Sequence, residues 1–111
     1  ESASLDDEDY EFTDKKLQAY MLHGVRYTVN TWKEMLIQVC GHILLEKRST
    51  IEWLCANEKC SFSTTPEEWR RELAPGMYVW TDNSTATKIN ILHGMFEECN
   101  IPASELVFEL S

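Results

Sequence analysis

The stretch LQAYMLHGVRYTVNTWKEMLIQVCGHILL, residues 17–45, decides the fold class because its apolar pattern changes from strand-like to helical within a few residues. Its first part holds two apolar and aromatic runs separated by His23-Gly24. Glycine supplies the positive φ that a two-residue hairpin turn requires. In that register Tyr20 lies opposite Tyr27 on one apolar face. We therefore expect an antiparallel hairpin followed directly by a helix.

That helix begins with a capping box, Thr31-Trp32-Lys33-Glu34, in which the threonine hydroxyl accepts the glutamate amide. The apolar residues that follow recur at helical i, i+3, i+4, i+7 spacing. They are Trp32, Met35, Leu36, Val39, Cys40, Ile43 and Leu44. The pattern predicts a helix with one buried face.

Further start signals divide the rest of the chain. Cap patterns at 49–52 and 65–68 predict two short helices, and residues 82–84 cap a longer one. Two apolar runs, 77–81 and 106–110, are typical of strands. The expected order is strand, strand, three helices, strand, helix, strand.

This order predicts an α+β fold with a four-stranded mixed sheet and helices packed on it. The strand at Met77 and the strand at Leu106 are expected to be parallel, because a helix of suitable length connects them. We expect a single domain over residues 15–111.

Residues 1–14 have a different composition. They carry seven of the chain's 19 acids and no Lys or Arg, which leaves 12 acids and 10 bases in the remainder. We interpret them as an acidic flexible linker or tail, and the chain as a piece of a longer protein. No signal peptide pattern or long apolar run is present, so we expect a cytoplasmic protein.

No pattern of a catalytic site was found. The four glycines are scattered, so no phosphate-binding loop is expected, and Cys55 and Cys60 have no second ligand pair that would complete a zinc site. We expect no cofactor, no metal and no catalytic residue. The two thiols are interpreted as a core cysteine and a loop cysteine.

Two groups of residues are candidates for binding. Tyr78 and Trp80 share one face of their strand, which forms a docking surface for a protein partner if no helix covers it. A basic and aromatic group suits a nucleic-acid strand. It comprises Lys47, Arg48, Lys59, Trp69, Arg70 and Arg71, with Trp80 as a further contact. Its alternative explanation is a set of helical salt bridges between the arginines and the neighbouring glutamates.

Several short motifs occur in a fixed order from about residue 17 to residue 110. They are the hairpin at His23-Gly24, Thr31-Trp32, Phe62-Ser63, Met77-Tyr78-Val79, Asn83-Ser84-x-Ala86-x-x-Ile89 and Leu106-Val107-Phe108. In this order the chain resembles a small C-terminal accessory module of prokaryotic proteins related to restriction and anti-phage nucleases. The resemblance implies an accessory domain and carries over no catalytic residue.

The sequence thus favours a non-enzymatic module that contacts a protein partner, a neighbouring domain of the same chain or a second copy. A nucleic-acid-binding module is the alternative, and a small hydrolase is a distant third. No membrane partner is expected.

Overall fold

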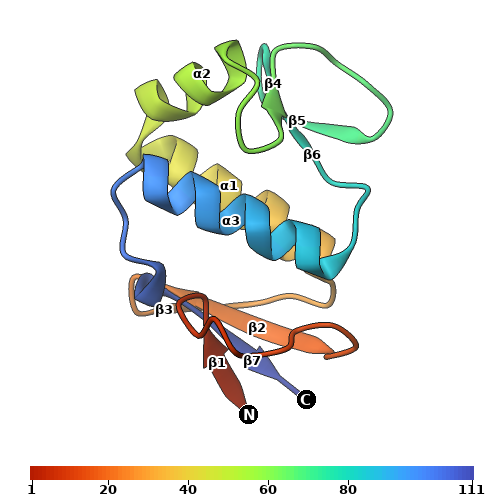
Figure 1. Cartoon of the computed structure of the whole chain (residues 1–111), viewed down its shortest axis with the longest axis vertical. Helices are drawn as coiled ribbons and strands as arrows, with labels where there is room; N and C mark the ends of the chain where they lie inside the picture. Colours follow the sequence, from red (N-terminus) through yellow and green to blue (C-terminus); the bar gives the residue numbers. More distant parts are fainter.

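The computed structural model describes residues 1–111 and arranges them in three layers (Figure 1). A large sheet forms one outer layer, two long helices form the middle, and a short helix with a small sheet forms the other outer layer. The α+β class and a four-stranded sheet with helices packed on it are therefore confirmed. The fourth strand of that sheet is Ser2–Ser4, however, and not the expected strand at Met77.

The large sheet has the strand order β1-β7-β2-β3, and every neighbouring pair is antiparallel. Its strands are β1 (Ser2–Ser4), β2 (Leu17–Leu22), β3 (Val25–Thr28) and β7 (Leu106–Leu110), the last preceded by the 3-10 turn η1 (Ala103–Glu105). The predicted hairpin register is confirmed, since Tyr20 pairs with Tyr27. The two turn residues have positive φ, 51° at His23 and 80° at Gly24.

Two long helices, α1 (Trp32–Glu46) and α3 (Thr85–Glu98), cover one face of this sheet. The short helix α2 (Arg48–Ala56) packs beyond them, beside the small sheet. The cap predicted at 49–52 is not formed, because α2 begins at Arg48 and its N-cap residue, Lys47, makes no side-chain cap hydrogen bond. The caps predicted for the two long helices are present: the Thr31 hydroxyl accepts the Glu34 amide at 3.0 Å, and the Ser84 hydroxyl accepts the Thr87 amide at 3.1 Å. Each bond satisfies an amide that the helix itself leaves unpaired.

The small sheet has the order β4-β6-β5 and is also antiparallel. Its strands are β4 (Phe62–Ser63), β5 (Arg70–Ala74) and β6 (Met77–Trp80). Val79, on the central strand, is fully buried, as expected for its inner face.

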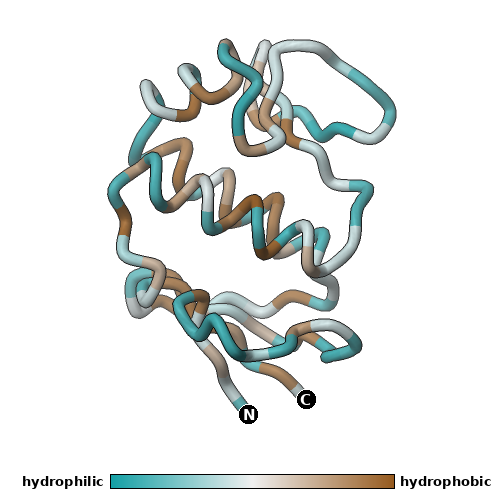
Figure 2. Tube along the Cα trace, viewed as in Figure 1, coloured by the Kyte–Doolittle hydropathy of each residue, from teal (hydrophilic) through white to brown (hydrophobic).

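One apolar core joins the three layers. It lies between the large sheet and α1 and α3, and it continues to α2 and the small sheet. Figure 2 shows hydrophobic residues along the two middle helices and hydrophilic ones in the connecting loops. On the outer face of the large sheet, Arg26 holds the Glu109 carboxylate through two hydrogen bonds of 2.9 Å.

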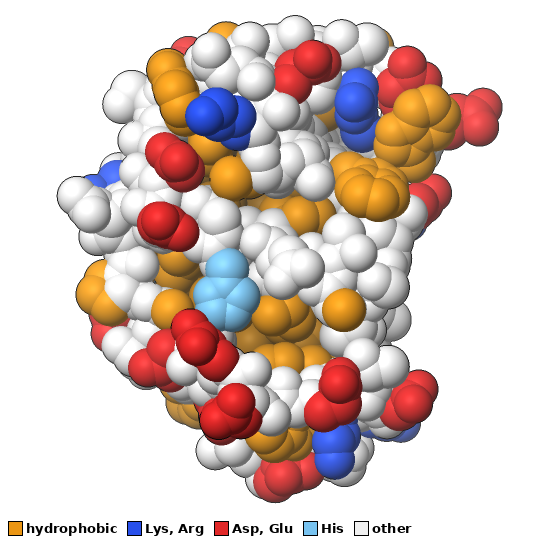
Figure 3. Space-filling model, viewed as in Figure 1, with side chains coloured by type: hydrophobic (Ala, Val, Ile, Leu, Met, Phe, Trp, Pro, Cys, Tyr) orange, Lys and Arg blue, Asp and Glu red, His pale blue; other side chains and the backbone are white.

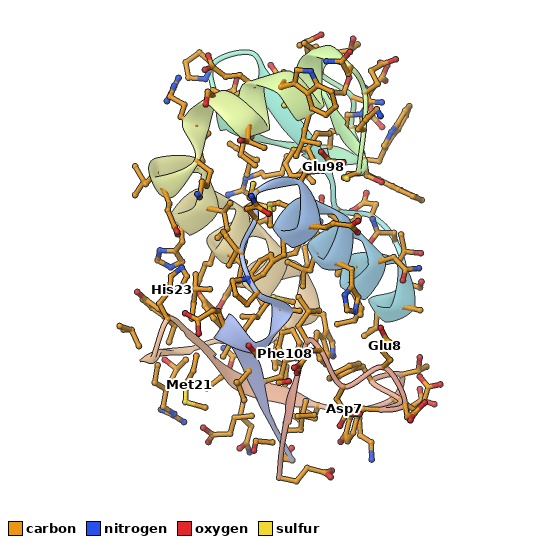
Figure 4. All side chains as sticks on the ribbon, turned by 60° about the vertical axis from the view of Figure 1, so that its left-hand side comes forward. Asp7, Glu8, Met21, His23, Glu98 and Phe108 are labelled. Atoms are coloured by element: carbon orange, nitrogen blue, oxygen red, sulfur yellow. The ribbon has the colours of Figure 1, made fainter.

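Residues 1–14 differ from the flexible segment that we expected. Their first strand, β1, pairs with β7, while Leu5 is fully buried and Phe12 is 6% exposed. Asp7 and Glu8 lie on the exposed loop that follows β1, as Figure 4 shows. A few apolar side chains at suitable positions therefore anchor the segment, although its composition is dominated by charge.

The N-terminal strand also brings the chain ends together. The Glu1 amino group donates to the Leu110 carbonyl oxygen at 3.0 Å, and the Leu110 amide donates to the Glu1 carbonyl oxygen at 2.7 Å. Figure 1 shows both termini at the end of the molecule that carries the large sheet.

Two finer predictions were wrong. No helix begins at Thr65-Pro66: the chain makes a turn, in which the Arg70 amide donates to the Glu67 carbonyl oxygen at 3.0 Å, and continues as β5. A helix of two turns is marginal by itself, so pairing with β6 prevails. The mixed sheet is also absent, because β6 and β7 belong to different sheets and no pair is parallel.

Candidate interaction site

A surface hollow of about 410 Å³ lies at the small sheet. Its lining residues are Glu58, Ser61, Phe62, Trp69, Arg70 and Trp80, and we call it the aromatic hollow. Figure 3 shows large hydrophobic side chains at this end of the molecule beside basic ones, with acidic side chains around them. The volume lies in the lower part of the range of small-ligand pockets, roughly 300–1,000 Å³.

Strand pairing brings the two tryptophans together. Arg70 pairs with Trp80 across β5 and β6. The Trp69 carbonyl oxygen accepts the Thr81 amide at 3.0 Å, which fixes the residue before β5 beside the end of β6. Two indoles far apart in sequence therefore flank one hollow on a hydrogen-bonded frame.

The indoles differ in exposure. Trp69 is 45% exposed, whereas Trp80 is half-buried. Neither indole N–H donates to a protein group, in contrast to Trp32, whose N–H donates to the Lys15 carbonyl oxygen at 3.0 Å. Exposed aromatic surface with unused donors is typical of residues at binding interfaces.

Arg70 is held by its own loop and not by an acid. Its Nη1 donates to the Thr65 carbonyl oxygen at 2.9 Å, which is the one hydrogen bond of this side chain. Neither Arg70 nor Arg71 forms an ion pair, because the salt bridges of the protein involve other residues. The interpretation of these arginines as partners in helical salt bridges is therefore wrong, together with the helix that it required.

The other wall of the hollow is a loop in an unusual backbone conformation. Glu58, Cys60 and Ser61 have φ values of 50°, 55° and 67°, a region that non-glycine residues seldom adopt. Hydrogen bonds hold this loop, among them Lys59 amide to Leu54 carbonyl oxygen at 3.0 Å. Such conformations persist where the surrounding structure enforces them, and they cluster at binding sites.

The two residues of the predicted docking face have separate environments. Trp80 lines the aromatic hollow, but Tyr78 does not. The Tyr78 hydroxyl donates to the Glu72 carboxylate at 3.0 Å, and this bond raises the pKa of Tyr78 because it holds the phenolic proton. Tyr78 thus contacts its neighbouring strand, and Trp80 is the member of the pair that lines the hollow.

The predicted basic group does not form one patch. Arg71 points away from Arg70 and lines a different depression with Lys33 and Gln38. Lys47 and Arg48 lie where α1 meets α2, and the nine-residue helix α2, roughly 13 Å long, separates them from the small sheet. Of this group, Trp69 and Arg70 are the members that line the aromatic hollow.

Lys59 stands apart from the hollow. Its ammonium lies 5.3 Å from the centre of the Trp53 ring, in a cation–π contact. Trp53 is 45% exposed, the same fraction as Trp69. The pair is therefore a second exposed aromatic and basic surface that does not line the hollow.

Sequence reasoning missed three of the lining residues. Glu58, Ser61 and Phe62 belong to a stretch without helical or strand periodicity, which was interpreted as a loop. Nothing in the local sequence signals their left-handed conformations or their position opposite Trp69. Only the pairing of β4 with β6 brings them to the site.

The cysteines show no arrangement for chemistry. Cys55 is buried and Cys60 is half-buried, and burial raises the pKa of both thiols, which disfavours the thiolate that metals and nucleophilic reactions require. No group of three or more His, Cys, Asp or Glu side chains is placed to hold a metal ion.

Comparison of the chain with protein-family models, with curated proteins and with solved structures finds no match. The resemblance to accessory modules of nuclease-related proteins therefore stays a prediction. Among the helices, none combines the length and apolar character that crossing a bilayer requires.

Proposed function

We propose that this domain is a non-enzymatic interaction module that binds a protein partner through the aromatic hollow. The observation that carries the proposal is the convergence of Trp69 and Arg70, at the start of β5, with Trp80, at the end of β6, on one open hollow. Tryptophan and arginine are the residues most enriched among those that dominate binding energy at protein interfaces. The role agrees with the accessory domain that the resemblance implies.

A site that binds by docking needs a rigid frame and no reactive group. The hollow has the frame, since β5 and β6 are paired and the loop before β4 is held by hydrogen bonds. It contains no histidine, cysteine or lysine among its lining residues, and its one carboxylate belongs to Glu58. These features favour recognition over catalysis.

To test this proposal, a photo-crosslinking amino acid is placed at position 69 or at position 53 of the full chain, and the protein is crosslinked in the cells that naturally produce it. Trp53 is the matched control, because it is as exposed as Trp69 and does not line the hollow. We expect protein adducts from position 69 that resist nuclease treatment and decrease when Trp80→Ala is added. Equal adducts from both positions, or adducts to nucleic acid alone, would refute the proposal.

A nucleic-acid strand is the second candidate, and the unpaired state of Arg70 and Arg71 favours it. The scattered positions of Lys47 and Arg48 weaken this candidate, because a strand needs a continuous basic track. Salt distinguishes the two functions: affinity for phosphates decreases steeply with ionic strength, whereas affinity for an aromatic docking partner changes little.

A further inference from the structure

We propose that the ligand of the aromatic hollow is a peptide segment in which a carboxylate lies next to a ring, as in Glu-Phe, Asp-Tyr or Glu-Pro. This inference rests on the proposed interaction function and specifies its partner. The hollow has unused hydrogen-bond donors, aromatic walls and a surrounding set of charges that together favour such a ligand.

Arg70 has hydrogen-bond donors that no protein group uses. A guanidinium has five N–H donors, and Arg70 uses Nη1 for the Thr65 carbonyl oxygen. That bond holds the side chain in place at the hollow and leaves the rest of the planar fork without a protein partner. A fork of this kind matches the two oxygens of a carboxylate or the oxygens of a phosphate.

Two tryptophans form the aromatic walls of the hollow. Trp69 and Trp80 present indole surface to it, whereas the Phe62 side chain, only 1% exposed, packs into the core beside Val79. Indole faces bind planar or compact rings by stacking or edge contacts, and proline-containing segments dock against such surfaces. The hollow therefore suits a ligand that carries a ring beside its anionic group.

The charges around the hollow distinguish a peptide carboxylate from a nucleic-acid backbone. Glu58 is itself a lining residue, and Glu67, Glu68 and Glu72 are exposed close to Arg70 in sequence. A nucleic-acid strand carries a phosphate at every nucleotide and meets these carboxylates as it leaves the hollow. A peptide places one carboxylate on Arg70 and its uncharged backbone beside the acids.

The experiment uses three short peptides with blocked ends, identical except for one position before a Phe-Pro pair, which holds Glu, Gln or Lys. Each is titrated into the labelled protein while the amide and indole N–H signals are followed by NMR. We expect the Glu peptide to shift the indole signals of Trp69 and Trp80 and to leave that of Trp53 unchanged. We expect it to bind about fivefold more tightly than its Gln twin, the factor given by an exposed ion pair near the upper end of the usual range.

The chain supplies a matched control for the arginine. Arg71 is adjacent to Arg70, also lacks an ion pair, and faces another depression. The Glu preference should be lost in Arg70→Gln and kept in Arg71→Gln. Arg70→Lys retains the positive charge but lacks the planar guanidinium, so it should keep part of the preference for Glu. This variant serves as the test if Arg70→Gln does not fold.

The results distinguish failure of the carboxylate inference from failure of the proposed function. If the three peptides shift the hollow signals with equal affinity, the carboxylate inference is wrong and the interaction function stands. If no peptide shifts them, or if a single-stranded oligonucleotide binds there more tightly than the Glu peptide, the inference and the proposed function both fail.

Discussion

Replacing Phe12 by Ala should destabilise the domain strongly, although Phe12 lies in a segment with an acidic composition. Its side chain is 6% exposed and contacts three aromatic rings. Ring centres lie 4.8 Å away for Tyr10, 5.8 Å for Trp32 and 5.3 Å for Phe108. The substitution removes the ring from this cluster and leaves a cavity between the segment, α1 and β7.

Truncation of a buried Phe to Ala costs about 3–5 kcal/mol, and a site at the edge of the core should lie in the lower part of this range. For a domain of this size each kcal/mol lowers the melting temperature by about 4 °C. We therefore expect a loss of about 3–4 kcal/mol and a decrease in melting temperature of about 12–16 °C. A typical domain stability of about 5–15 kcal/mol leaves the variant folded.

Urea unfolding, followed by tryptophan fluorescence and by circular dichroism, measures this loss. Glu8→Ala is the control, because Glu8 is an exposed residue of the same segment and should change stability by less than about 0.5 kcal/mol. If Phe12→Ala behaves like Glu8→Ala, residues 1–14 are not packed in solution and the flexible segment predicted from the sequence is correct.

Three further predictions concern other parts of the molecule. His23 hydrogen-bonds Glu105 and Glu46, each at 2.9 Å, and these bonds raise its pKa above 6.5. The stabilisation due to its protonation should therefore be complete well below pH 6.5 and disappear as the pH rises through the higher folded-state pKa. The difference in unfolding free energy between the protein and His23→Gln should be larger at pH 5 than at pH 9 by at most about 1 kcal/mol, and a difference that does not change with pH would contradict this reasoning. Gly94→Ala should cost about 1–2 kcal/mol in urea unfolding, because the new methyl group meets the Cys60 sulfur at 2.7 Å. In a Cys60→Ala background the cost should disappear and the higher helix propensity of alanine within α3 should remain as a gain of up to about 1 kcal/mol, whereas a persistent cost would exclude the clash. A chelator should leave the thermal transition unchanged, whereas a large shift with release of one zinc equivalent would reveal a structural metal site.

Local sequence signals predicted the parts of the fold that local physics determines. The His23-Gly24 turn, the Thr31 cap and the Ser84 cap each depend on residues within four positions of one another, and the structure contains all three. The strand predicted at the C-terminal end, with alternate side chains facing the core, is also confirmed, since Leu106 and Phe108 are buried.

The errors arose where distant pairing outweighs composition or a local cap. The acidic segment is ordered by β7, which lies about a hundred residues away in sequence. The cap pattern at Thr65-Pro66 is a correct turn signal, but its continuation depends on β6 and not on helix propensity.

The candidate site was predicted only in part, for the same reason. The sequence predicts a helix for Trp69 and Arg70 and a strand for Trp80. It therefore assigns Trp69 and Arg70 to the basic group and Trp80 mainly to the docking face with Tyr78. The pairing of β5 with β6 unites them. The rim supplied by Glu58 and Ser61 follows from backbone conformations that no local pattern signals.

The adjacent chain ends have a consequence for protein engineering. Because the Glu1 amino group reaches the Leu110 carbonyl oxygen, a short linker can join the termini without disturbing β1 or β7. New ends can then be opened at the exposed Pro75-Gly76 turn, which makes the domain a candidate for circular permutation and for insertion into a loop of a host protein. Without permutation, a fluorescent protein or surface anchor fused at either end is attached at the end of the molecule that carries the large sheet. The molecule is 37 Å long in its longest dimension. Such a fusion leaves the opposite end, with Trp69 and Trp80, open to solvent.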